Sequence, residues 1–172
     1  MKRSASKSEV SAVGAKLKLD KKFQPCAAEP GDELYPNGIF VFNITRLLAF
    51  IETHAERFPV ESIELEDIPD YGNDESLDQE SIDAADILRP ILIAEIAPGR
   101  YNLIDGHHRV AQARREGERT LPAYKLRCPH HVPFLTSSQA YEKYVEYWNS
   151  KLKDLNGFAL PQAPDSHLKK RA

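Results

Sequence analysis

The sequence predicts an α+β fold, in which a small mixed β-sheet is flanked by helices, with a C-terminal helix and flexible tails. Short apolar runs rich in β-branched residues lie between segments with helical periodicity, a pattern that is typical of strands and helices in one domain. The 172-residue chain is 41% hydrophobic, which is enough to bury the core of such a domain. Its two ends carry no periodic apolar face.

The chain divides into three predicted parts. Residues 1–35 are rich in Ser, Lys, Ala and Pro, and we expect a basic, mostly disordered tail. Residues 36–155 contain the periodic apolar positions and form the folded domain. Residues 156–172 contain prolines and a basic end, which predicts a second tail.

The folded part opens with a predicted strand in the apolar run 39–44, directly after Gly38. Asn43 or Thr45 can cap the helix that follows, and Pro59 ends it. One face of this helix carries Leu47, Leu48, Phe50, Ile51 and His54.

The acidic middle of the chain predicts a strand, a loop and a short helix. Residues 60–68 alternate apolar and acidic side chains, which indicates a half-exposed strand. Residues 69–78 have the composition of a loop, and residues 78–87 predict a helix. The apolar residues expected to face inward are Val60, Ile63, Leu65 and Ile68 on the strand, and Ile82, Ala85 and Leu88 on the helix.

The most regular part predicts a hairpin, a helix and a strand. The apolar runs 91–96 and 101–104 are joined by a Pro-Gly-Arg turn and form the hairpin. Residues 107–116 predict a helix that Gly117 ends, with Val110, Ala111 and Ala113 inward, and a strand is expected over 120–126.

The last predicted element is a helix capped by Ser137 or Ser138. Its apolar stripe consists of Tyr141, Tyr144, Val145, Trp148 and Leu152. Such a stripe belongs to a core or a partner contact more often than to a base-stacking surface.

The net charge of −3 conceals an uneven distribution of charge. Residues 1–22 carry seven Lys or Arg, whereas residues 59–88 carry eleven Asp or Glu and no basic residue. Residues 169–171 are basic again. The basic tails can attract DNA nonspecifically, or they can simply keep the ends solvated.

The sequence argues against a membrane protein, a secreted protein and a disulfide-stabilised protein. No apolar run approaches the roughly 20 residues of a membrane span, so we expect no membrane insertion. The basic N-terminus lacks the apolar stretch of a signal peptide. Cys26 and Cys128 stand alone, which argues against a disulfide scaffold and favours a cytoplasmic protein.

The candidate chemistry is concentrated in DGHHR, from Asp105 to Arg109, between a predicted strand and a predicted helix. Gly106 permits a tight turn, and the first amides of the helix then form an anion site. His107, His108 and Arg109 add side-chain donors, which predicts a phosphate cradle.

The same residues also have a purely structural interpretation. Asp105 can merely cap the helix, and a histidine pair at a helix start can hydrogen-bond locally. His107 and His108 do not share a helical face, so they are poor joint ligands for one metal.

The stretch RPILIAEIAPGRYNLIDGHHRVAQARREGERTLPAYKL, residues 89–126, resembles the ParB/sulfiredoxin superfamily. The resemblance rests on the two strands, the Gly-x-His-Arg turn, the Ala-rich helix, its Gly and the strand that follows, and it extends back to residue 60. It implies a small mixed sheet and the binding of nucleotide phosphates at Gly106 to Arg109.

The DGHHR turn and the length of the chain differ from those of two known branches of this superfamily, which makes the functions of those branches less expected here. Sulfiredoxins place a catalytic cysteine where His107 stands, which argues against sulfinic acid reduction. Partitioning ParB proteins have a GERR-type turn and further DNA-binding and dimerisation domains, for which this chain has no room. DGHHR is similar to the turn of ParB-like free serine kinases, and the chain's size is similar to the plasmid-borne oncogenic-suppression and fertility-inhibition proteins.

Three functions remain open on this basis. The first is a nucleotide-binding ParB-like effector with ATP hydrolysis and metal-dependent DNase activity, which inhibits plasmid or T-DNA transfer and contacts a conjugative or type IV secretion component. The second is a free serine kinase, and the third is a non-catalytic partner-binding protein with exposed aromatic residues on its last helix.

The first function assigns a set of site residues. A nucleotide, ATP or another, and Mg²⁺ or Mn²⁺ are the expected cofactors. Asp70 is a further candidate carboxylate, in addition to Glu66, Asp67 and Asp105. The predicted catalytic residues are Asp105, His107, His108 and Glu66, the nucleotide-binding residues are Gly106, His107, His108 and Arg109, and the metal ligands are Asp105 and Asp67.

Overall fold

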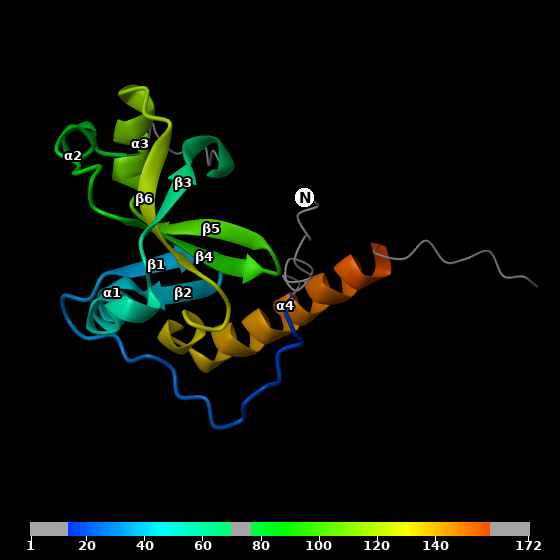
Figure 1. Cartoon of the computed structure of the whole chain (residues 1–172). Coiled ribbons are helices and arrows are strands. Elements are labelled where there is room, and N and C mark those ends of the chain that lie inside the picture. The colour runs from blue at the N-terminus through cyan, green and yellow to red at the C-terminus, as the bar shows by residue number, and fades with distance from the viewer. Residues whose placement is uncertain (1–13, 70–76, 159–172) are drawn as a thin grey trace, which may run out of the picture.

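A computed structural model describes residues 14–69 and 77–158 of the chain (Figure 1). The elements follow one another as β1 (Leu34–Asn37), β2 (Phe40–Asn43), α1 (Ile44–Thr53), η1 (Ala55–Arg57), β3 (Glu61–Glu64), η2 (Leu65–Asp67), α2 (Gln79–Asp83), β4 (Ile91–Ala97), β5 (Arg100–Asp105), α3 (His107–Arg115), β6 (Thr120–Leu126), η4 (Val132–Phe134) and α4 (Ser138–Phe158). This is the α+β architecture that the sequence predicts.

The central sheet is mixed, with the strand order β3-β6-β4-β5. Strands β4 and β5 form the predicted antiparallel hairpin, and β3 pairs antiparallel with β6. Strands β4 and β6 run parallel, because α3 carries the chain back across the sheet between β5 and β6. A separate hairpin of β1 and β2 completes the strands.

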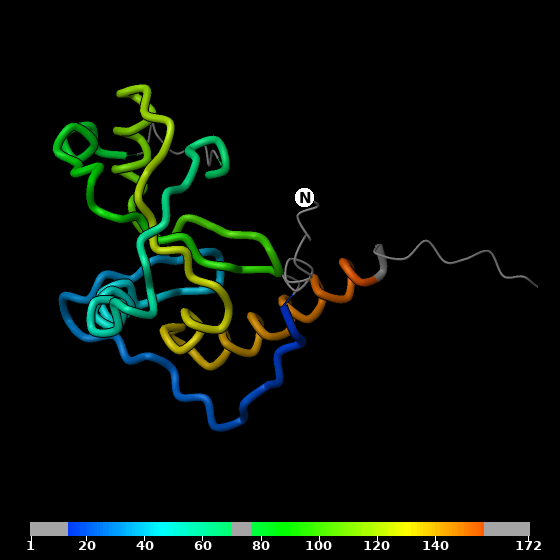
Figure 2. Tube along the Cα trace, viewed as in Figure 1, coloured from blue at the N-terminus to red at the C-terminus, as the bar shows by residue number. Residues whose placement is uncertain are grey.

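Two apolar layers cover the two faces of the sheet (Figure 2). All seven residues of β4 are buried, because this strand lies between both layers. The larger layer joins β2, α1 and α4 to one face, and its most enclosed side chains include Phe42, Ile51, Leu92, Leu126, Tyr144 and Trp148. The smaller layer joins α3 and η2 to the other face through Leu65, Ile68, Ile93, Leu103, Val110 and Leu121.

The aromatic stripe of α4 lies in the core. Tyr144 is 0% exposed and Trp148 is 2% exposed, and Tyr141 is buried as well. These side chains are therefore not the exposed partner-binding surface that the third function requires. Ser137 caps the helix start by accepting a hydrogen bond from the amide of Ala140, as predicted. In the described part of the chain, no helix is both long and apolar enough to cross a membrane.

Part of the predicted N-terminal tail, residues 15–23, is held against α4 (Figure 1). The backbone of Leu17 exchanges two hydrogen bonds with the side chain of Asn149, at 2.8 and 2.9 Å. Phe23 stacks on Tyr141 with ring centroids 3.9 Å apart. The expectation of disorder does not hold here, because single anchoring contacts fix this segment and leave no periodic signal in the sequence.

Two further differences concern the acidic middle of the chain. The strand predicted over 60–68 ends at Glu64, and η2 follows. Leu65 and Ile68 are three positions apart, so this single helical turn brings both side chains to the buried side. Val60 is 52% exposed, contrary to the alternating pattern. The predicted loop residues 70–76 lie outside the described residues.

The short helix predicted over 78–87 is the five-residue α2, which Asp78 caps. Ile82 is fully buried as predicted, but Leu88 is 80% exposed, because a helix of this length cannot bring both residues to one face. Helix α1 likewise ends before the prediction, at Thr53, and η1 continues toward Pro59. Asn43 caps α1 by accepting the amide of Arg46.

Candidate functional site

A single glycine shapes the turn between β5 and α3. Gly106 has a φ of 103°, in the left-handed region. A Cβ on this residue would lie 2.6 Å from Cγ2 of Ile91, closer than real Cβ atoms pack, so that Ile91 or the turn would have to shift. Only glycine therefore fits both the backbone conformation and the close approach to β4.

The turn directs the first amides of α3 out of the helix. The first intrahelical bond runs from the amide of Val110 to the carbonyl of Gly106, so the amides of residues 107–109 precede the ladder. Gly106 supplies no capping side chain. This end of α3 is therefore electropositive, as the sequence predicts for a phosphate cradle.

An open hollow of about 260 Å³ lies at this helix start; we call it the α3 hollow. It is lined by Glu33, Tyr35, Leu77, Ile104, Asp105, Gly106, His107 and His108. Four of the predicted site residues therefore meet in one place. The sequence does not point to Glu33 and Tyr35, because they belong to an N-terminal segment that carries no motif and has the composition of a disordered tail.

Tyr35 and His107 contact each other inside the α3 hollow. The Tyr35 hydroxyl lies 3.2 Å from Nε2 of His107, and the two rings stack with centroids 5.1 Å apart. Burial lowers the pKa of His107, and the nearby Asp105 carboxylate offsets this only in part. His107 is therefore neutral at pH 7 and can accept a proton or a hydrogen bond.

Arg109 has other partners than the predicted phosphate. Its Nη1 donates to the carbonyls of Arg89 and Pro90, and its Nη2 donates to Oδ2 of Asp105 at 3.0 Å. Arg109 is 8% exposed and does not line the α3 hollow. Its guanidinium fixes Asp105 and the residues before β4, so it acts on the hollow through Asp105.

The predicted carboxylates do not assemble. Asp67 lines a different hollow, of about 210 Å³, formed with Ile63, Pro69, Tyr101 and Lys125 among others. Glu66 is exposed on η2 and lines neither hollow. Asp70 lies outside the described residues.

A metal site made of protein ligands alone is not formed in the described part of the chain. Across residues 14–69 and 77–158, no three His, Cys, Asp or Glu side chains come together in a way that could hold a metal ion. The carboxylates that line the α3 hollow are Glu33 and Asp105. The predicted pairing of Asp105 with Asp67 around one ion is therefore not supported.

Part of the chain is similar to a known protein family. Residues 54–131 match the ParB N-terminal domain. The matched range contains the whole four-stranded sheet, the Gly106 turn and α3. It supports the resemblance to the ParB/sulfiredoxin superfamily without identifying a branch. No curated protein matches the sequence significantly.

The match leaves out two residues of the site and several elements of the fold. The hairpin of β1 and β2, which supplies Tyr35, precedes the matched range, as does Glu33. The whole of α4 follows it. The α3 hollow therefore combines a ParB-like turn with a wall that lies outside the ParB-like part of this chain.

Proposed function

We propose that this protein binds a nucleotide at the α3 hollow, with the phosphates at the start of α3, and hydrolyses it. The observation that carries the proposal is the left-handed Gly106, which begins α3 at a hollow lined by two histidines. Helix N-termini of this kind stabilise phosphate charge. The ParB-like match over the same turn supports it.

Each residue that lines the α3 hollow has its own role in this proposal. The amides of α3 and the His108 side chain hold phosphate oxygens. Neutral His107, oriented by Tyr35, accepts a hydrogen bond from water or a phosphate hydroxyl. Asp105, held by Arg109, orients the histidines, and the exposed Glu33 carboxylate is the base that activates the attacking water.

Mg²⁺ or Mn²⁺ remains part of the proposal as a companion of the nucleotide. Such an ion needs only one or two protein carboxylates when phosphates and water supply its other ligands. Asp105 would provide such a carboxylate. When bound, the ion would neutralise phosphate charge.

DNA cleavage and interference with plasmid or T-DNA transfer are the wider role that we attach to this site. They rest on the ParB/sulfiredoxin resemblance and on the basic N-terminal segment, of which Lys16, Lys18, Lys21 and Lys22 lie in the described part. A conjugative or type IV secretion component is the protein partner that this role implies.

A free serine kinase is the second candidate, and one observation favours it. Kinase chemistry needs a carboxylate close to the substrate hydroxyl. The sequence predicts this carboxylate at the end of the 60–68 strand, but Asp67 lies in a different hollow. Glu33 instead provides it beside the histidines.

Titration with ATP, ADP and CTP tests binding, and release of inorganic phosphate with Mg²⁺ tests hydrolysis. We expect binding to weaken at least about ten-fold in His108→Ala, since a hydrogen bond to phosphate is lost. His54→Ala is the control, because His54 follows α1 and lines no part of the α3 hollow. Equal affinity in the two variants contradicts the site.

The reaction products separate the candidate functions. Phosphate release without serine, together with nicked plasmid DNA, supports the effector. Phosphoserine formed only when serine is added supports the kinase. Nucleotide binding without either product leaves a regulatory nucleotide site.

A further inference from the structure

The hollow that Asp67 lines lies on one face of the central sheet, and we call it the sheet hollow. Its volume is about 210 Å³, and it shares no residue with the α3 hollow. No residue of α3 lines it, although α3 covers another part of the same face. Its lining residues come from all four strands, from η2 and the two residues after it, and from the β4–β5 turn: Ile63, Asp67, Ile68, Pro69, Ile93, Gly99, Tyr101, Leu103 and Lys125.

The floor of the sheet hollow is apolar. Ile93 and Leu103 are direct partners on β4 and β5, and both side chains are buried. Ile63 and Tyr101 pack against the same apolar layer but are only partly buried. An apolar group that filled the hollow would therefore remove further apolar surface from water, which stabilises its binding.

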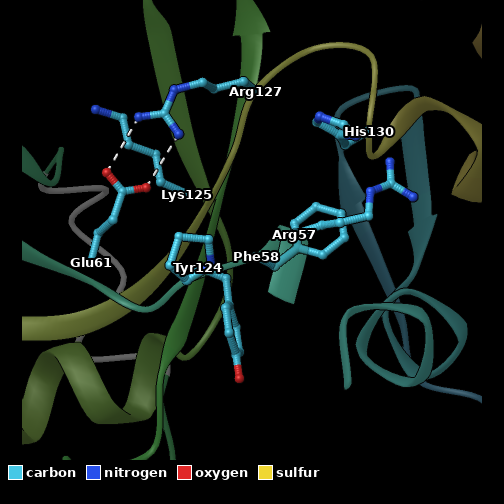
Figure 3. A pocket seen from close by; sticks show the side chains of 8 residues that line it. Arg57, Phe58, Glu61, Tyr124, Lys125, Arg127 and His130 are labelled. Atoms are coloured by element: carbon cyan, nitrogen blue, oxygen red, sulfur yellow. Dashed lines mark hydrogen bonds and ion pairs between the residues drawn. The ribbon is translucent and has the colours of Figure 1, made fainter. Parts of the chain in front are cut away.

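One ammonium group lies on this apolar floor. Lys125 is half-buried beside Ile93, and its Nζ lies 4.6 Å from the ring centroid of Tyr101. Lys125 also lines the smaller hollow drawn in Figure 3, but Tyr101 does not, so the ammonium belongs to the sheet hollow. The contact with the ring restricts the side chain and leaves its N–H donors for a ligand.

The neighbouring carboxylates do not pair with Lys125. In the part of the chain that the structure describes, no carboxylate lies within ion-pair distance of its ammonium. Glu61 is bound by Arg127 at 3.2 and 3.3 Å, as the dashed lines of Figure 3 show, and both oxygens of Glu95 accept backbone amides. Asp67 is exposed, so water can solvate its charge, whereas the half-buried ammonium has neither a carboxylate nor full solvation.

We propose that the sheet hollow binds a small monocarboxylate with an apolar body, whose carboxylate pairs with Lys125. The apolar body lies on Ile93 and Leu103, and the ion pair compensates the half-buried ammonium. The volume is about seven times the roughly 30 Å³ that one water occupies, which suits a molecule of about seven to ten non-hydrogen atoms. The Asp67 carboxylate repels a second anionic group, so the hollow selects against dicarboxylates and phosphates.

Titration of the full chain with hexanoate, followed by NMR, tests the proposal. We expect the side-chain methyl signals of Ile63, Ile93 and Leu103 to shift, which locates binding in the sheet hollow and apart from the α3 hollow. Hexanol keeps the apolar body without the charge, and adipate adds a second carboxylate. Each should bind about ten-fold more weakly than hexanoate.

Substitutions of the two charged residues separate their roles. Lys125→Met removes the ammonium but keeps an apolar side chain, so it should weaken hexanoate binding about ten-fold and leave hexanol binding unchanged. Lys125→Arg keeps the charge and should retain hexanoate binding, which distinguishes loss of the cation from loss of structure. Asp67→Asn should strengthen adipate binding, and Lys143→Met, which removes a cation paired with Glu146 on α4, should change nothing.

The proposal is overturned if hexanoate leaves the three methyl signals unshifted, or if hexanol binds the wild-type protein as tightly as hexanoate does. It is also overturned if Lys125→Met and Lys143→Met have equal hexanoate affinity, because the charge would then not act in the sheet hollow. Adipate that binds as tightly as hexanoate would contradict the selection by Asp67.

Discussion

The Asp105 carboxylate and the Arg109 guanidinium lie 3.0 Å apart, four positions from each other in the sequence, with side chains only 13% and 10% exposed. This pair connects the end of β5 to the first turn of α3, and two further bonds from Arg109 reach the carbonyls of Arg89 and Pro90. The two most polar residues of the DGHHR turn thus stabilise each other inside the protein.

Replacing Arg109 by Gln should destabilise the protein by about 3 kcal/mol, because it leaves the Asp105 carboxylate without its cation in a mostly buried place. Denaturant unfolding of the single variants and of the double variant Asp105→Asn with Arg109→Gln measures the coupling. Additive effects would show that the two side chains do not stabilise each other. Because of this pair, Asp105→Asn changes stability as well as chemistry.

Gly106→Ala should cost about 2–4 kcal/mol, from the left-handed backbone and from the Cβ that would lie 2.6 Å from Ile91. Gly117→Ala is the matched control at the other end of α3, since its φ is also positive but nothing lies near its Cβ. The control should lose only about 1–2 kcal/mol. Equal losses of unfolding free energy in the two variants would argue against the close approach of β4.

Glu33→Gln should lower nucleotide turnover by about 100-fold or more if its carboxylate activates the attacking water. The melting temperature should not change, because Glu33 is exposed. Glu118→Gln removes an exposed carboxylate that does not line the α3 hollow and should leave turnover unchanged. Unchanged turnover in Glu33→Gln would remove this residue from the proposed chemistry.

The buried His131 should make stability depend on pH. Burial lowers the pKa of His131 to about 4. The unfolded chain therefore takes up the proton first, near its ordinary pKa of about 6.5. The stability that neutral His131 contributes is complete above pH 6.5 and is lost as the pH falls toward 4, by roughly 3 kcal/mol in total.

Thermal unfolding between pH 7 and pH 5 checks this dependence. His131→Gln should flatten the decline in melting temperature, since it removes the titrating ring but keeps a donor for the carbonyl of Glu95. His130→Gln, next to it and exposed, should flatten the decline much less. A wild-type melting temperature that stays constant from pH 7 to pH 5 would contradict the assignment.

Asn149→Ala should detach the N-terminal segment and lower the unfolding free energy by about 1–2 kcal/mol, because two hydrogen bonds to the backbone of Leu17 are lost. Protease cleavage between residues 14 and 26 should accelerate. Asn156→Ala, at an exposed position further along α4, is the control. Cleavage at an unchanged rate would show that other contacts, such as Phe23 on Tyr141, are sufficient.

The periodic parts of the chain could be predicted from the sequence, and the irregular parts could not. Strand β6 has the predicted bounds, and α3 differs by one residue, because apolar spacing and Gly117 define them locally. Residues 15–23 depend on contacts with α4, more than a hundred positions later, and local pattern carries no information about such contacts.

Some features of the candidate site could likewise be predicted from the sequence, and others could not. The Gly106 turn could be predicted, because a glycine between an apolar strand and a helix is typical of a tight turn that needs a positive φ. The direction of Arg109 toward Asp105 and the Arg89 carbonyl could not, since an arginine that binds phosphate and one that binds a carboxylate look the same in a sequence. Tyr35 and Glu33 reach the site only through the fold.

The contact between Leu17 and Asn149 joins two segments of the chain that are synthesised at very different times. The two residues are 132 positions apart, so the first described segment emerges from the ribosome long before its partner helix has been made. During synthesis, the sheet can form while α4 is still missing and Leu92, Leu126 and Phe42 remain uncovered on one face. We expect completion of α4 to cover that face and to bind residues 15–23, so that this contact forms late in folding.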